Sequence, residues 1–190
     1  TRYGAAVDLG TTTLAACLYR TDGERLAQAG GPNPQHSWGA DVISRVEAAL
    51  KREGPALARS VREGIGELLC VLSYKAGIGP ELIDQVVITG NTVMLYLLTG
   101  TDPDSLARAP FMAYRLFGEE LPAAELGLPC IHGTVYLPRC ISAFVGGDIT
   151  TALLYSGICN GAGIKLLADV GTNGEMALWH KGRLTCCSTA

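Results

Sequence analysis

The chain has 190 residues, a formal net charge of -3 and a hydrophobic share of 48%. This length suits one large domain or one and a half small ones. The mildly acidic balance leaves no basic footprint for nucleic acid and no polybasic patch for a membrane surface. The 24 glycines exceed the usual share of roughly 7%, which predicts many tight turns or places where the backbone meets a ligand.

The seven cysteines are an odd number, are scattered along the chain and form no C-x-x-C pair. This usage favours reduced thiols over a disulfide framework and argues against a zinc or iron–sulfur site held by this chain. No apolar run reaches the roughly 18 residues of a membrane span, and no signal peptide opens the chain. We therefore expect a cytoplasmic protein without a membrane partner. Because a strand follows Thr1 at once, we also expect a piece of something longer.

The first forty residues predict a small antiparallel sheet. Apolar and β-branched runs indicate strands over 3–10, 11–20 and 25–30. A turn over 21–24 has Asp-Gly at its centre, the strongest short hairpin signal. The segment 31–38 is typical of an irregular loop.

The middle of the chain predicts two longer helices, one strand and a short helix. Apolar residues at helical spacing indicate helices over 39–54 and 55–77, separated by a Gly-Pro pair. A buried strand follows at 85–90. The segment 91–100 is typical of a short helix with Asn91 as its N-cap.

The remainder predicts a second group of strands behind another helix. The segment 101–129 contains four prolines and is expected to be a loop-rich excursion with weak local structure. A strand is predicted over 131–138, and a helix over 144–158 begins with Gly-Gly-Asp. A strand over 164–171 and a hairpin over 175–188 follow. Helices and strands are mixed throughout, so the fold class is α/β.

An Asp-x-Gly-Thr pattern occurs twice, each time after an apolar strand and before a hairpin. In the first copy Gly10 allows the backbone to turn and approach a ligand. The N–H groups of Thr11, Thr12 and Thr13 can converge on an anion, while Asp8 can hold Mg²⁺ against the phosphate oxygens. The second copy offers the same set in Asp169, Gly171, Thr172 and Asn173.

Two such hairpins that face each other would clamp a di- or triphosphate and its Mg²⁺ from both sides. The Walker pattern is absent. One copy alone is also typical of an ordinary glycine-containing turn. The repetition of the whole strand–loop–hairpin unit favours phosphate binding.

Two further polar residues have alternative interpretations. Asp148 lies at a predicted helix start, where a carboxylate serves as a cap. It is equally suited to orient or deprotonate an attacking water. Asn91 is either a helix cap or part of the polar lining of the same cleft.

The two loops resemble the phosphate motifs of a known superfamily. "VDLGTTT" and "ADVGTNGE" are similar to the first and second phosphate motifs of acetate and sugar kinases, heat-shock cognate chaperones and actin. "FVGGDITTALL" resembles the first connecting helix between the two lobes of these proteins. A closer resemblance, to the reductive activators of corrinoid proteins, rests on six stretches: "NPQ" with "GADVISRV", "ITGNTVM", "PRCISAFVGGDIT", "LLADVGTNGEMAL" and "CCSTA".

This resemblance implies a fold, a ligand and an activity. Residues 1–163 would form a ribonuclease-H-like ATPase lobe with a mixed sheet flanked by helices, and 164–190 the first hairpin of a second lobe. ATP or ADP with Mg²⁺ would bind between them, with Asp8 and Asp169 as metal ligands and Asp8 and Asp148 as catalytic residues. ATP hydrolysis would drive reduction of Co(II) to Co(I) in a corrinoid iron–sulfur or methyltransferase protein.

The chain departs from that family in two respects. It lacks cluster-binding cysteine spacing, so the iron–sulfur cluster is expected in a module absent from this chain. It also ends before the superfamily's Gly-rich adenosine motif. Two alternatives stay open: a small-molecule kinase or dehydratase-type activator on the same fold, and a partner-docking piece without nucleotide competence. A homodimer formed by strand exchange is a further expectation.

Overall fold

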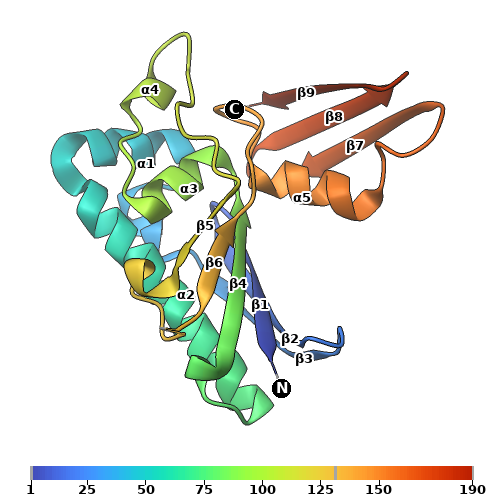
Figure 1. Ribbon diagram of the computed structural model, residues 1–190. Helices are drawn as coiled ribbons and strands as arrows, with labels where there is room; N and C mark the ends of the chain where they lie inside the picture. Colours follow the sequence, from blue (N-terminus) through green and yellow to red (C-terminus); the bar gives the residue numbers. More distant parts are fainter. Residues whose placement is uncertain (1, 131, 190) are drawn as a thin grey trace.

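A computed structural model of the protein describes residues 2–130 and 132–189, and it contains two sheets (Figure 1). The six-stranded sheet has the order β3-β2-β1-β4-β6-β5. Within it β1, β4 and β6 run parallel, and the other three strands are antiparallel to their neighbours. Its strands are β1 (Tyr3–Leu9), β2 (Thr13–Arg20), β3 (Arg25–Pro32), β4 (Ile83–Gly90), β5 (Glu119–Pro122) and β6 (Thr134–Leu137).

Alternation along β1 decides which face of the larger sheet is covered. Ala5, Val7 and Leu9 are buried, while Ala6 and Asp8 between them are exposed. Because successive strand residues point to opposite faces, the apolar set faces the helices and Asp8 points to the other side. The strand's C-terminal end thus carries a carboxylate on the open face.

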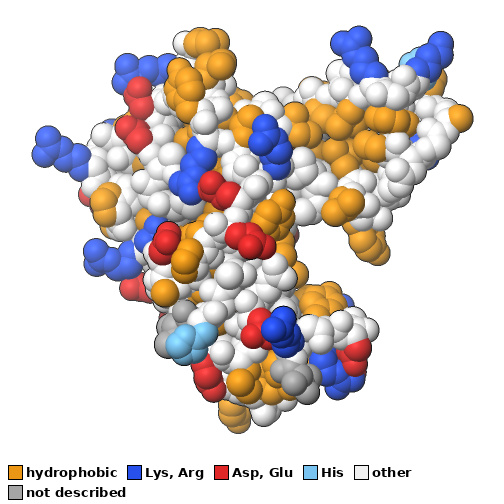
Figure 2. Space-filling model, viewed as in Figure 1, with side chains coloured by type: hydrophobic (Ala, Val, Ile, Leu, Met, Phe, Trp, Pro, Cys, Tyr) orange, Lys and Arg blue, Asp and Glu red, His pale blue; other side chains and the backbone are white. Residues whose placement is uncertain are grey.

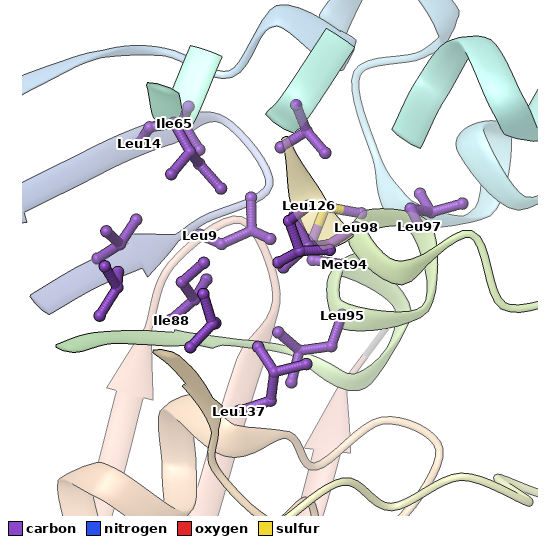
Figure 3. Close-up of a cluster of buried hydrophobic side chains, with 14 of the residues drawn as sticks. Leu9, Leu14, Ile65, Ile88, Met94, Leu95, Leu97, Leu98, Leu126 and Leu137 are labelled. Carbon is purple, nitrogen blue, oxygen red and sulfur yellow. The ribbon is translucent and has the colours of Figure 1, made fainter. Parts of the chain in front are cut away.

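Three helices cover the buried face: α1 (Val42–Ala48), α2 (Gly54–Ala76) and α3 (Thr92–Thr99) (Figure 1). The long helix α2 packs on β2 and β3. Each fully buried aliphatic side chain of this kind contributes about 1.5 to 3 kcal/mol. The core row of α2 is Leu57, Val61, Ile65, Leu69 and Leu72, and Figure 3 shows the neighbouring core around Met94.

Helix α5 (Gly147–Ser156) joins the two sheets from the open face. Thr89 of β4 and Thr151 of α5 have their hydroxyl oxygens 3.2 Å apart. On its other side α5 packs through Ile149 and Leu153 on the smaller sheet, whose order is β7-β8-β9. Its strands are β7 (Ile164–Val170), β8 (Gly174–His180) and β9 (Arg183–Thr189).

The smaller sheet has one covered and one uncovered face. Five side chains that point away from α5 are apolar and exposed, and hydrophobic side chains gather over this region in Figure 2. They are Ile164, Leu166, Val170, Met176 and Leu178. Helix α5 therefore covers one face of this sheet, and the other face exposes apolar side chains.

Several predicted elements have different bounds. The predicted helix over 39–54 begins only at Val42, because the Asp41 side chain caps it by accepting from the Ser44 N–H, and it bends through a π-helical segment η2 (Ala49–Glu53). The predicted loop over 31–38 contains the last residues of β3 and a 3₁₀ turn, η1 (Pro34–Trp38). A second 3₁₀ turn, η3 (Pro80–Leu82), precedes β4.

The expectation of weak structure over 101–129 is wrong in one respect. The segment contains the helix α4 (Asp104–Ala107), the edge strand β5 and the turn η4 (Ala123–Leu126). β5 was missed because its four residues make no periodic pattern, and pairing with β6 is what orders it. The strand predicted over 131–138 is reduced to β6, and its first residue, Ile131, lies outside the described residues.

The structure also bears on the cysteines and on membranes. All seven cysteines are free. Among residues 2–130 and 132–189, no helix has the length and apolar character needed to cross a membrane. The expected α/β class, with a mixed sheet flanked by helices and a second hairpin, is confirmed.

Candidate functional site

The first loop, residues 10–13, follows β1, and Asn33 donates hydrogen bonds to two of its carbonyl oxygens. The Asn33 backbone N–H donates to the Thr12 carbonyl oxygen and its side-chain Nδ2 donates to the Gly10 carbonyl oxygen, each at 2.8 Å. A Cβ on Gly10 would lie 2.7 Å from the Thr13 carbonyl oxygen, so only glycine fits this close turn. The carbonyl groups of residues 10 and 12 are thus both fixed by Asn33, the residue that follows β3.

The second loop, residues 171–173, follows β7 and touches the first. The Thr172 and Thr12 hydroxyl oxygens lie 2.8 Å apart, although 160 residues separate them in the chain. Within the loop, the Gly171 N–H donates to the Asn173 carbonyl oxygen. The structure therefore brings together the two copies of the repeated motif, as the sequence analysis expects.

A cavity of about 200 Å³ lies between the loops. All the site residues proposed from the sequence line it, together with Leu9, Asn91 and Glu175. The residues shared with the sequence proposal are Asp8, Gly10, Thr11, Thr12, Thr13, Asp148, Asp169, Gly171, Thr172 and Asn173. Four carboxylates and no lysine, arginine or histidine line this cavity among the described residues.

Glu175 is the site residue that the sequence reasoning missed. It lies in β8 directly opposite Asp169 of β7, so both carboxylates project from the same face of the hairpin. Its side chain is buried, and the Ser188 hydroxyl donates to Oε1 at 3.1 Å. The signal in the sequence was the spacing between Asp169 and Glu175. In a tight hairpin, an acidic residue just after the turn pairs across the strands with an acidic residue just before it.

Burial and neighbouring negative charge raise the pKa values of Asp8, Asp148 and Glu175. Burial raises the pKa of Asp148 to about 6, and the neighbouring charges of Glu175, Asp169 and Asp8 add to this. Partial desolvation by the walls of the cavity likewise raises the pKa values of Asp8 and Glu175, with the charge of Asp169 as a smaller cause in both. Negative charge is therefore disfavoured in this cavity, and a bound cation would stabilise it.

Two helices begin at this cavity. Asn91 caps α3 by accepting from the Met94 N–H at 2.9 Å, and its Nδ2 donates to the Thr11 hydroxyl at 3.2 Å. Both interpretations of Asn91, as cap and as cavity lining, are therefore correct. At the start of α5 the Asp148 carboxylate accepts from the Ile149 N–H at 2.8 Å. Positive helix ends favour an anion here.

The donor set suits Mg²⁺. Carboxylate, hydroxyl and amide oxygens are the ligands this hard cation prefers, with phosphate and water completing its shell. Among the described residues no group of three His, Cys, Asp or Glu side chains is close enough to hold a metal alone. A cation bound here would complete its shell with water or with oxygens of a bound phosphate. No cysteine lines the cavity, so these residues do not fit an iron–sulfur cluster.

Two other hollows help to define the site. Asp8, Asp148 and Asp169 also line a second hollow of about 340 Å³ on the α5 side, together with Tyr155 of that helix. A larger cavity of about 860 Å³ lies between α2 and η4 and contains none of the loop residues. The candidate site is therefore identified by the residues that line it and not by its volume.

The mixed sheet, the two loops in contact and the helix that joins the sheets define the actin-like ATPase fold. A putative 2-dehydro-3-deoxygalactonokinase from Sinorhizobium meliloti has this fold at a TM-score of 0.50 and 16% identity, over 97% of this chain and 52% of that one. The family model described as the RACo middle region matches residues 3–160, and the chain belongs to this family.

Three relatives of the chain are named for the activation or reduction of corrinoid proteins. The corrinoid activation enzyme RamQ of Eubacterium limosum is 34% identical over 194 residues, which are 99% of this chain and 32% of RamQ. A reductase of a methylated amine-specific Co(II) corrinoid protein, from Methanosarcina barkeri, is 26% identical over 99% of this chain and 36% of its own length. The solved reductive activator for a corrinoid, iron–sulfur protein has a TM-score of 0.95 at 35% identity, covering 98% of this chain and 30% of that one.

The chain thus spans about a third of the length of the curated relatives it matches. The resemblance to corrinoid-protein activators that the sequence motifs suggest is confirmed by the family match.

Proposed function

We propose that the cavity between the two loops binds the phosphates of ATP or ADP with Mg²⁺, and that the whole protein couples ATP hydrolysis to the reduction of Co(II) to Co(I) in a corrinoid protein. The observation that carries this proposal is the contact of two Asp-x-Gly-Thr loops around a cavity with four carboxylates and no cationic side chain among the described residues. A divalent cation bound together with a polyphosphate would offset the repulsion from these carboxylates. The family relation supports the corrinoid protein as the partner.

Different residues of this chain would bind the metal, bind the phosphate and accept a proton. Asp8 and Asp169 would hold Mg²⁺ directly or through water, and the metal when bound neutralises phosphate charge. The N–H and hydroxyl groups of Thr11, Thr12 and Thr172 would bind phosphate oxygens. Asp148, with its pKa near neutrality, would accept a proton from the attacking water.

The remaining assignments extend the same proposal. Residues 1–163 would be one lobe and 164–190 the start of a second, with Gly10, Thr13, Gly171 and Asn173 shaping the two loops. An iron–sulfur module outside this chain would supply the electron. A homodimer is proposed on the two unpaired edges, β7 and β9, of the smaller sheet as the structure describes it.

Calorimetric titration of the whole protein with Mg-ATP and Mg-ADP tests the proposal. We expect binding that requires Mg²⁺ and that disappears in Asp8→Ala and Asp169→Ala. The matched control is Asp84→Ala, an exposed aspartate at the opposite end of β4. Binding that persists in chelator would refute the metal role. ATP turnover stimulated by a corrinoid protein would separate the activator from a kinase, and absence of nucleotide binding would favour the docking alternative.

A further inference from the structure

Arg45 of α1 is a buried cation without an ion pair among the described residues. Its side chain is 0% exposed. Nε donates to the Gly39 carbonyl oxygen at 3.0 Å, and Nη1 lies 3.4 Å from the Met94 sulfur. Nη2 has no hydrogen-bond partner within residues 2–130 and 132–189, and no carboxylate there lies within ion-pair distance of the guanidinium. The acid that acts on it electrostatically is Asp41, which is exposed.

Stability does not explain an arginine at this position. Removing a cation from water is costly, and a buried charge that lacks a carboxylate partner regains little of that cost. Apolar residues of similar volume often stabilise a protein when they replace buried charged groups. The guanidinium therefore needs an explanation outside the core.

The contacts of Arg45 lead to the first phosphate loop. The Met94 sulfur, which lies inside the core cluster of Figure 3, is also 3.9 Å from Asn33 Nδ2. Asn33 is itself 0% exposed and holds the carbonyls of Gly10 and Thr12. The guanidinium thus lies behind the loop, two side chains away from its backbone.

The charge of Arg45 complements what the cavity lacks. The cavity is lined by four carboxylates and by no cationic side chain of the described residues. In surroundings of low polarity the field of a charge extends further than in water. A cation behind the loop would therefore counter the repulsion between these carboxylates and an incoming polyanion.

We propose that Arg45 is the cationic positioning residue of the phosphate site: its buried charge favours the bound polyphosphate through the loop, and its contact with Met94 supports Asn33 against Gly10. This inference rests on the proposed binding of Mg-ATP. It assigns a role to the "NPQ" and "GADVISRV" stretches, which contain Asn33 and Arg45.

The test compares Arg45→Met and Arg45→Lys in the whole protein by calorimetric titration with Mg-ATP, Mg-ADP and adenosine, and by thermal unfolding. Because the effect acts on ligand charge, Arg45→Met is expected to weaken Mg-ATP about tenfold, Mg-ADP about threefold and adenosine not at all. Its Tm should equal or exceed that of the wild type. Arg45→Lys keeps the charge and should restore most of the Mg-ATP affinity.

The matched control is Arg62→Met. Arg62 is a half-buried arginine of α2 that donates to the Leu98 carbonyl oxygen and lines the larger cavity away from the loops. It should leave all three affinities unchanged. Asn33→Asp is the second variant, because it removes the Nδ2 donor to the Gly10 carbonyl oxygen while Arg45 stays in place. It should bind Mg-ATP more weakly.

The outcomes are distinct. Equal loss for adenosine and Mg-ATP, or a lowered Tm that accounts for the loss, would overturn the charge role. Wild-type Mg-ATP affinity in Arg45→Met or Asn33→Asp would also overturn it while leaving the proposed function intact. A wild-type protein that binds no Mg-ATP would overturn the proposed function and this inference together.

Discussion

Replacement of Asp148 by asparagine tests the electrostatics of the site most directly. The side chain of Asp148 lies among three other carboxylates, and burial raises its pKa from 3.8 to about 6. The folded state therefore binds more protons at Asp148 than the unfolded state does between these two values. The stability linked to Asp148 is fully present below about pH 4 and is lost as the pH rises through 6.

The magnitude follows from the two pKa values. Between about pH 4.5 and pH 7.5 the ionisation of Asp148 lowers the free energy of unfolding by about 2 kcal/mol. The introduced asparagine cannot ionise, and its amide oxygen can still accept from the Ile149 N–H. The stability of Asp148→Asn relative to the wild type should therefore increase by about 2 kcal/mol over this pH range.

Urea unfolding of the two proteins at several pH values measures this difference. A carboxyl-carbon NMR titration gives the pKa of Asp148 independently. Asp84→Asn, at the exposed start of β4, is the control and should follow the wild type at every pH. A constant difference between Asp148→Asn and the wild type, or a measured pKa near 4, would refute the reasoning. In the whole protein the same variant should bind Mg-ATP and lose about 10² to 10⁴-fold in turnover.

Two further substitutions test the loop and the core. Gly10→Ala places a Cβ 2.7 Å from the Thr13 carbonyl oxygen, so we expect Mg-ATP affinity to fall at least about tenfold by calorimetry, at a cost in stability of about 1 to 3 kcal/mol. Gly31→Ala in β3, where a Cβ meets no atom within 4 Å, should change neither, and an unaltered Gly10→Ala would contradict the close-turn argument. Leu69→Ala empties a fully buried position of α2 and should cost about 2 to 5 kcal/mol in urea unfolding, whereas Leu82→Ala, 49% exposed, should cost far less. Similar losses for the two leucines would show that α2 does not pack as described.

Much of the candidate site could be predicted from the sequence, because the chemistry is carried by local pattern. An apolar strand followed by Asp-x-Gly-Thr predicts a tight turn from neighbouring residues alone. Because this pattern occurs twice, it identified both loops and the aspartates proposed as metal ligands. The contact of Thr12 with Thr172 could not be read in this way, since 160 residues separate them and no local preference specifies their distance. Glu175 was missed because cross-strand pairing with Asp169, and not proximity in sequence, gives it a place in the cavity.

The sequence by itself determined the α/β class, the hairpins and the apolar rows of α2, because strand and helix periods are properties of neighbouring residues. Only the tertiary structure decided that β5 joins the large sheet, that Arg45 is buried with no ion pair to the described residues, and that four carboxylates share one cavity. The pKa of Asp148 depends on those neighbours and on burial, which arise only when distant segments pack together. Local sequence pattern thus identifies most residues of the site, whereas the packing of distant segments determines their charge state.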